Sequence, residues 1–280
     1  MIYYKTKEEI EIIRQGGKIL ANILENLGQK IVPGASTAEL EEIAVSSIEG
    51  AGGRPSFKNY DMGDDIFFPS GLCVSINNEV VHGASLPDRI IKEGDIVSLD
   101  IGMEWPIQTK EEAINNNRPY NNKSQLGGFY TDTCRTFPAG KISKEAKKLL
   151  EVTKEALNLG ISKAIAGNTL NDIGKIIGDY VKSQGYSSVR DLVGHGVGYF
   201  AHEDPNVFHY EIGNNSFENM TLEPGMVIAI EPMINQGKFR VKMDGNGYTI
   251  ITSDGLLSAH FEHSIAILEK GRGNIVLTSL

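Results

Sequence analysis

The sequence predicts an α+β domain in which one unit, two helices followed by strands, occurs twice. The first observation is the pattern Gly-x-[Ser/Thr]-x-x-[acid]-[Leu/Ile]-x-x-Ile, which begins at Gly34 and again at Gly167. The second is that an amphipathic helix precedes each copy, and the third is that strand-like runs follow both pairs of helices. Chance similarity between amphipathic helices is the alternative. A duplicated fold would bring functional groups from both halves to a cleft between them.

Four helices are predicted from capping signals and from apolar residues at helical spacing. Pro33-Gly34 separates the first two, and Gly167 separates the last two. In chain order the predicted helices are residues 6–29, opening with Thr6-x-x-Glu9; a helix opening with Ser36-x-x-Glu39; Lys144 to Ala164; and a helix opening with Thr169-x-x-Asp172.

Strands are predicted where β-branched and aromatic residues form short apolar runs. These runs are Cys73 to His82, Asp95 to Gly102, Phe129 to Phe137, Asp191 to Tyr199, Met226 to Asn235 and Phe261 to Leu268.

A long irregular insert, residues 103–128, separates two of these runs and is rich in Asn, Lys, Gln and Gly. If Asp100 and Asp132 lie opposite each other on an antiparallel pair, the insert is the extended tip of a hairpin. Its polar composition offers little apolar surface to anchor it, which predicts a peripheral and mobile excursion. Deleting Thr109 to Ser124 is therefore expected to leave catalysis within a few-fold of the parent.

Composition excludes several classes of protein. The chain has 280 residues, 40% of them hydrophobic and 22% charged, which is typical of a folded globular protein. The net charge of −9 gives no reason to expect nucleic-acid binding. The N-terminal residues lack the apolar core of a signal peptide, and no apolar run is long enough for a membrane span. With two cysteines and no disulfide framework, the cytoplasm is the expected compartment.

Four acidic residues stand inside strand-like runs: Asp100, Asp132, Glu231 and Glu262. Burying an ionised carboxylate costs several kcal/mol unless a partner compensates for it. His195 adds an imidazole between glycines, which let other groups come close. Oxygen ligands with a single nitrogen suit a pair of hard or borderline divalent cations better than a structural zinc. The alternative is that each acid is salt-bridged or ends a strand.

The motifs resemble those of the methionine aminopeptidases of type I, in the family's order over nearly the whole chain. Each motif alone is weak, but the ordered set is specific. The matching segments are Ser75-Ile-Asn-Asn-Glu-Val-Val-His82-Gly, Lys92 to Gly102, Asp132-Thr-Cys-Arg-Thr-Phe, Gly194-His195-Gly-Val-Gly, His202-Glu-Asp-Pro, Gly225 to Asn235, Asp244-Gly-x-Gly-Tyr-Thr and Ser258-Ala-His-Phe-Glu262-His.

The resemblance implies the "pita-bread" fold, in which helices cover a central antiparallel sheet with pseudo-two-fold symmetry, as one catalytic domain over residues 1–280. It implies a binuclear metal site made of the same five residues, holding two divalent ions such as Co, Mn, Fe, Zn or Ni. The implied activity is removal of an N-terminal methionine before a small second residue. Asp132 and Glu262 would bridge the two metals, and a hydroxide shared by the metals would attack the carbonyl of the methionine.

The resemblance also implies roles for individual residues. Glu231 would accept a proton from the bridging water, and His82 and His202 would contact the scissile amide and stabilise the oxyanion. Each of these two histidines could instead be a hydrogen-bonded loop residue. His263 is expected to point away from Glu262, and no catalytic role is predicted for the remaining histidines, His209 and His260.

By resemblance, five residues would surround the methionine side chain, although such residues are more often plain core: Phe57, Tyr60, Phe68, Cys73 and Tyr248. The chain departs from the family at Ala201, where Phe is common, and Phe200 is a candidate to replace it. The insert between Asp100 and Asp132 is a second departure. The implied partners are nascent polypeptide N-termini, with possible transient ribosome association, and the chain is expected to be a monomer.

Two rival functions remain. A proline-directed peptidase of the same fold would share all five ligands, but the segments around Glu231 and Glu262 favour the methionine branch, and the short N-terminus leaves no room for those enzymes' extra domain. A non-catalytic binding module is the other rival, and the complete ligand set argues against it.

Overall fold

The computed structural model describes residues 1–63 and 65–280. The predicted helices are confirmed as α1, α2, α4 and α5, and a short helix, α3, lies in the insert. Their bounds are α1 Lys7–Gly28, α2 Thr37–Gly50, α3 Lys110–Asn115, α4 Lys144–Lys163 and α5 Leu170–Ser183.

The predicted capping residues begin these helices. Thr6 accepts a hydrogen bond from the backbone N–H of Glu9, and the Glu9 carboxylate accepts one in return from the Thr6 N–H. Gly34 and Gly167, where the repeated pattern starts, have φ angles of +93° and +97°. This left-handed conformation favours glycine, so the pattern marks the same kind of turn in both halves.

The strands are more numerous than predicted and most are shorter, because loops divide the apolar runs, but β4 continues past the predicted end at Gly102 to Trp105. They are β1 Arg54–Pro55, β2 Leu72–Ile76, β3 Glu79–Val81, β4 Ile96–Trp105, β5 Phe129–Pro138, β6 Ser187–Ser188, β7 Gly194–Gly196, β8 Glu203–Val207, β9 Val227–Ile230, β10 Met233–Asn235, β11 Val241–Met243, β12 Ile250–Thr252, β13 Ser258–His260, β14 His263–Ile267 and β15 Asn274–Val276.

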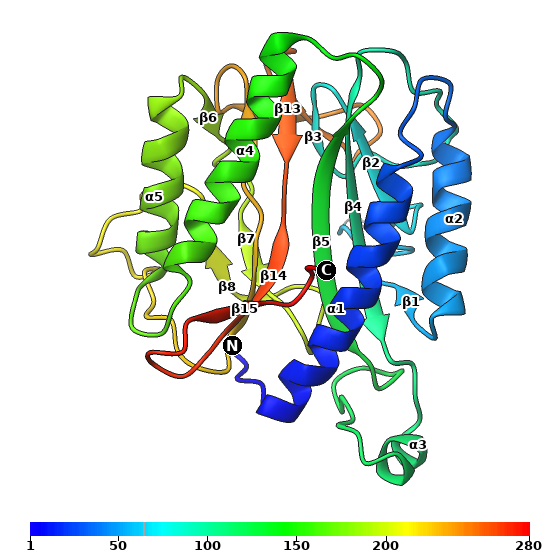
Figure 1. Ribbon diagram of the computed structural model, residues 1–280, viewed down its shortest axis with the longest axis vertical. Helices are drawn as coiled ribbons and strands as arrows, with labels where there is room; N and C mark the ends of the chain where they lie inside the picture. Colours follow the sequence, from blue (N-terminus) through cyan, green and yellow to red (C-terminus); the bar gives the residue numbers. More distant parts are fainter. Residues whose placement is uncertain (64) are drawn as a thin grey trace.

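The two halves of the molecule each carry an antiparallel sheet. One sheet has the order β1-β4-β2, with β5 also paired to β4, and the other has the order β15-β14-β9-β7-β8. Two small sheets, β13-β10-β6 and β11-β12-β3, complete the strands of the described residues. Helices α1 and α2 flank the first half, and α4 and α5 flank the second (Figure 1).

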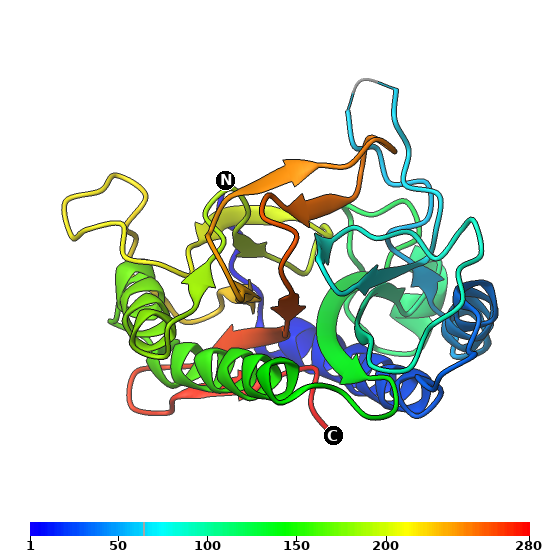
Figure 2. The same cartoon turned by 90° about the horizontal axis from the view of Figure 1, so that it is seen from above.

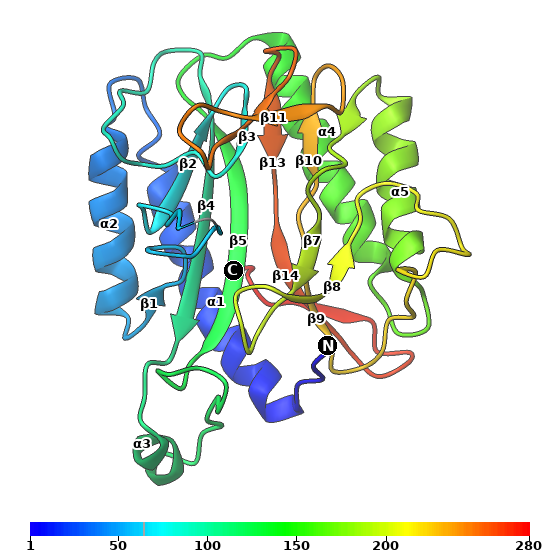
Figure 3. The same ribbon diagram turned by 180° about the vertical axis from the view of Figure 1, so that it is seen from behind.

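The halves meet where β5 lies beside β13 and β14, near the middle of the molecule (Figure 3). At this seam the N–H of Glu262 donates to the carbonyl of Cys134 over 2.9 Å, and the Thr133 hydroxyl donates to the carbonyl of Glu262 over 2.9 Å. The strands lie over a layer formed by α1 and α4, the blue and green helices of Figure 2. The seam fixes the position of one half's ligands relative to the other's.

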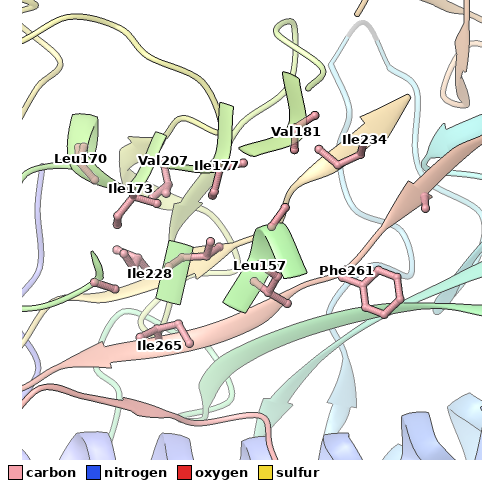
Figure 4. Close-up of a cluster of buried hydrophobic side chains, with 14 of the residues drawn as sticks. Leu157, Leu170, Ile173, Ile177, Val181, Val207, Ile228, Ile234, Phe261 and Ile265 are labelled. Carbon is pink, nitrogen blue, oxygen red and sulfur yellow. The ribbon is translucent and has the colours of Figure 1, made fainter. Parts of the chain in front are cut away.

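Each half has its own hydrophobic core between helices and sheet. In the second half, Leu157 of α4 and Ile177 of α5 pack with Ile228 of β9 and Ile265 of β14 (Figure 4). In the first half, the corresponding cluster joins α1, α2 and the sheet through Leu20, Leu40, Leu72, Leu99 and Ile101. Burying side chains of this size contributes roughly 1.5–3 kcal/mol each, so these cores hold the strands that carry the candidate ligands.

Candidate metal centre

Asp100 and Asp132 lie on the neighbouring antiparallel strands β4 and β5, as predicted. They are not directly opposite, because Asp100 pairs with Cys134 and Asp132 pairs with Gly102. Residues two positions apart on a strand share a face, so both carboxylates still point to the same side of the sheet.

Glu231 and Glu262 lie at interruptions of the strands, which corrects the prediction that they stand inside them. β9 ends immediately before Glu231, where Pro232 has no N–H for a sheet ladder, and β14 begins immediately after Glu262. Because β9 pairs with β14 and β10 pairs with β13, the two interruptions lie opposite each other. The fold thereby opens a gap in the sheet with a glutamate on each side.

His195 lies at the centre of β7, and its flanking glycines permit close packing, as predicted. A Cβ atom at Gly194 would lie 2.3 Å from the carbonyl oxygen of Ala229, and one at Gly196 would lie 2.2 Å from that of Asp204. Side chains at these two positions would push the neighbouring strands apart. The imidazole Nδ1 contacts the Gly196 carbonyl at 2.9 Å, which leaves Nε2 free to act as a ligand.

The candidate ligand atoms lie close together. One atom each from Asp132, His195 and Glu262 falls within 4.8 Å of the other two. His195 Nε2 is also 3.3 Å from Oε1 of Glu231.

Burial makes these carboxyl groups harder to ionise in the absence of a cation. It raises the pKa of Asp100 to about 6 and raises the pKa values of Asp132, Glu231 and Glu262 well above their usual range, and neighbouring carboxylates add to the effect on Asp132 and Glu262. Burial also lowers the pKa of His195 to about 3, so its imidazole is neutral, the form that binds metals.

The site fits a pair of divalent cations. One carboxylate oxygen on each of Asp100, Asp132 and Glu262 is buried without a hydrogen-bond partner among the described residues. Buried polar atoms normally have a partner, so three such oxygens beside one another point to an external cation. Carboxylate oxygens with one imidazole suit Mn²⁺, Fe²⁺, Co²⁺ or Zn²⁺.

Two buried histidines lie next to Glu231, although the sequence predicted no catalytic role for them. The Glu231 N–H donates to Nε2 of His209 over 3.1 Å, and Nε2 of His260 lies 3.5 Å from Oε2 of Glu231. Neither histidine lines the cavity described below. His260 precedes Glu262 by two residues, a spacing that places side chains on the same face of a strand. The sequence could therefore have indicated that His260 lies near the ligands.

A cavity of about 490 Å³ is lined both by the predicted metal ligands and by predicted substrate-binding residues. All five candidate ligands line it, together with His82 and His202 and four of the five predicted methionine-pocket residues. The cavity also includes residues that the sequence did not single out: Asp61, Met62, Val81, Asp191, Leu192, Val193 and Met233.

The apolar end of this cavity is a cluster in which Phe57, Phe68 and Cys73 pack together and Tyr60 and Met62 pack against them. Cys73 is 3% exposed, and burial raises the pKa of its thiol, which agrees with a wall residue rather than a nucleophile.

Two residues differ from their expected positions. Tyr248 does not line the cavity; its ring packs edge-on against Phe68 at a centroid distance of 5.6 Å. Phe200, the suggested replacement beside Ala201, is 39% exposed and packs against Tyr3 outside this cavity. Phe200 therefore does not line this cavity, and it borders a neighbouring hollow together with His195 and His202.

The two histidines predicted to contact the scissile amide lie on loops at the cavity. His82 has a φ angle of +56°, and burial lowers its pKa to about 4. His202 lies with its ring centroid 4.4 Å from that of His195. His263 points away from the site, as predicted, and its Nδ1 is 3.0 Å from the Thr278 hydroxyl.

Comparison with known proteins agrees with the candidate metal site. The sequence model described as metallopeptidase family M24 matches residues 11–108 and 123–269. The chain is 42% identical over 272 residues to a methionine aminopeptidase of Clostridium perfringens, covering 97% of both chains. The unmatched residues 109–122 fall within the predicted insert.

Solved structures agree. The crystal structure of methionine aminopeptidase from Thermotoga maritima superimposes with a TM-score of 0.86 and 35% identity, covering 100% of both chains. An Xaa-Pro dipeptidase of Bacillus anthracis shares the fold at a TM-score of 0.70 and 22% identity, and the match covers 62% of that chain.

Proposed function

Because the chain belongs to metallopeptidase family M24, we propose that it removes the N-terminal methionine from nascent proteins and peptides whose second residue is small. The observation that carries the proposal is one cavity in which an apolar cluster adjoins five metal-ligating side chains. The relatives named above support methionine as the residue removed. The preference for a small second residue is the expectation raised by the resemblance.

Asp100, Asp132, His195, Glu231 and Glu262 are the proposed ligands of two divalent cations. Such cations would polarise the scissile carbonyl and lower the pKa of a shared water towards neutrality. The acids and His195 lie on elements from both halves of the fold, so the packing of the two halves against each other sets their relative positions.

Glu231 is the proposed proton acceptor, and its carboxylate has His195 on one oxygen and His260 on the other. His202 is the proposed donor to the developing oxyanion. In the tautomer in which the Tyr60 hydroxyl donates to Nδ1, the ring carries its proton on Nε2, the atom left to donate to substrate.

Polypeptide N-termini are the proposed substrates, and Phe57, Phe68 and Cys73 are the proposed walls around the methionine side chain. None of the helices among the described residues is both long enough and apolar enough to cross a membrane. We further propose a cytoplasmic monomer that docks transiently at the ribosome.

A peptide panel tests the proposal. The protein is freed of metal, reloaded separately with Mn²⁺, Fe²⁺, Co²⁺, Ni²⁺ or Zn²⁺, and assayed on Met-Ala-Ser, Met-Leu-Ser, Leu-Ala-Ser and an Xaa-Pro peptide. We expect turnover of Met-Ala-Ser alone to be fast, and Glu231→Ala measures the background. Comparable cleavage of all four peptides, or of the Xaa-Pro peptide alone, would overturn the assignment.

A further inference from the structure

The turn that carries His202 is held by the residue that follows it. The Oε1 atom of Glu203 accepts hydrogen bonds from the N–H groups of Tyr199, at 2.5 Å, and Phe200, at 2.9 Å. These bonds close residues 199–203 into a compact turn. The position of the His202 ring therefore depends on the Glu203 carboxylate.

Glu203 is fixed in turn by the N-terminal segment. Its Oε2 pairs with Nζ of Lys5 at 2.5 Å, and both side chains are buried, with 0% and 1% of their surfaces exposed. The Lys5 N–H donates to the carbonyl of Gly225 over 2.8 Å. A Cβ atom at Gly198 would lie 2.6 Å from Cε of Lys5, so the glycine leaves room for the lysine stem.

The insert holds the same turn from the other side. The Asn121 side-chain amide donates to the carbonyl of Tyr199 over 3.0 Å and to that of Gly128 over 2.6 Å. Asn121 is 1% exposed, and the nearby Ser124 hydroxyl bonds the buried Glu104. The expectation that the whole insert is peripheral is therefore wrong for its first residues, which continue β4 to Trp105 and include the buried Met103. It is also wrong for the returning arm, residues 119–128, although α3 extends away from the body (Figure 1).

We propose that Asn121 and Lys5 are positioning residues for His202, acting through the turn at residues 199–203. Both lie outside the residues that the family M24 model matches. The inference rests on the proposed function, because it requires that His202 contact the substrate. A small displacement of a catalytic group lowers kcat even when the group itself is intact.

A double-mutant cycle tests this on the full, metal-loaded chain with Met-Ala-Ser as substrate. Asn121→Ala, His202→Ala and the double variant are compared for kcat, KM, bound metal and thermal stability. We expect Asn121→Ala to lower kcat by roughly 3–10-fold in the parent and to change it little in the His202→Ala background. Asn116→Ala, an exposed asparagine on the α3 side of the insert, is the matched control and should match the parent.

Equal losses in both backgrounds would show that Asn121 does not act through His202 and would overturn the proposal. Full activity of Asn121→Ala, or of His202→Ala, would overturn it as well. Parent turnover of Met-Ala-Ser in the same assay reports separately on the proposed function.

The role of Lys5 is tested with a second pair of variants, because Lys5→Met alone leaves the buried Glu203 carboxylate without its cation. Lys5→Met should lower both kcat and stability, whereas Lys5→Met with Glu203→Gln keeps the acceptor for Tyr199 and Phe200 without the charge. We expect the double variant to regain most of the lost kcat. A double variant as stable as the parent but as slow as Lys5→Met would argue against the positioning role.

The insert itself supplies a third comparison. Replacing residues 110–117 by a short Gly-Ser linker retains Asn121 and should leave kcat near the parent value. Deleting Thr109 to Ser124 removes Asn121 and should lower kcat at least as far as Asn121→Ala. Equal activity of the two deletions would contradict the proposal.

Discussion

The hydroxyl of Tyr60 lies 2.8 Å from Nδ1 of His202, and the two rings pack edge-on at a centroid distance of 5.0 Å. The resemblance assigned Tyr60 to the methionine pocket. The structure gives the same residue a second contact, because its ring lines the cavity while its hydroxyl reaches the proposed oxyanion donor.

Removing this hydroxyl should impair catalysis more than binding. Tyr60→Phe keeps the ring in the cavity wall but leaves Nδ1 of His202 without its partner, so the tautomer and ring orientation are no longer fixed. We expect kcat on Met-Ala-Ser to fall by roughly 10-fold with little change in KM. Tyr180→Phe, at a half-buried tyrosine of α5 that does not line the cavity, is the control. A change in KM alone would assign Tyr60 to methionine binding only.

Removing a proposed ligand should abolish activity. Asp132→Ala and Glu231→Ala should each lower kcat/KM by several orders of magnitude, because one removes a proposed bridge between cations and the other a ligand that also accepts a proton. Bound metal per chain, measured by elemental analysis, should fall with activity in Asp132→Ala. Full activity of chelator-treated parent protein would exclude the metal mechanism.

His260 should matter although it does not line the cavity. His260→Ala removes the group 3.5 Å from Oε2 of Glu231, and losing a side chain that orients a metal ligand typically costs roughly 10–100-fold in metal affinity or activity. Titrating the metal-free protein with Mn²⁺ while assaying its activity measures both metal affinity and catalytic activity. His263→Ala removes the histidine that faces Thr278 instead, and it should affect stability only. Equal metal affinity in parent and His260→Ala would contradict this role.

The metal-free protein should lose stability as the pH rises above about 7. Burial raises the folded-state pKa values of Asp132, Glu231 and Glu262 well above their usual range, so the folded state holds protons there that the unfolded state has released. Buried histidines have lowered pKa values and oppose this trend at lower pH, but above about pH 7 they are neutral in both states.

Thermal unfolding between about pH 7 and 8.5, with chelator and then with Mn²⁺, measures the effect. We expect the melting temperature of the metal-free protein to fall across this range and added Mn²⁺ to restore more stability at the higher pH, because cations bind the deprotonated acids. Asp132→Asn should flatten the metal-free curve. A melting temperature that rises with pH in the metal-free protein would refute the explanation.

Local sequence determined the helices and the identity of the proposed ligands. A capping box such as Thr6 with Glu9 acts within one turn, and the glycines at Gly34 and Gly167 are required by the backbone conformation of a single residue. The acids were detectable for a similar reason, since a carboxylate in an apolar run is unfavourable wherever the run lies in the fold.

Only the tertiary structure decided how distant groups meet. The opposed interruptions at Glu231 and Glu262 depend on the register of two strand pairs, and the contact between Asn121 and Tyr199 joins segments 78 residues apart. Composition does not reveal that contact, because a buried asparagine that donates hydrogen bonds to two carbonyls and an exposed loop asparagine are the same residue type. Their difference comes from which backbone carbonyls the fold brings within reach, and that is set by packing between the two halves rather than by neighbouring residues.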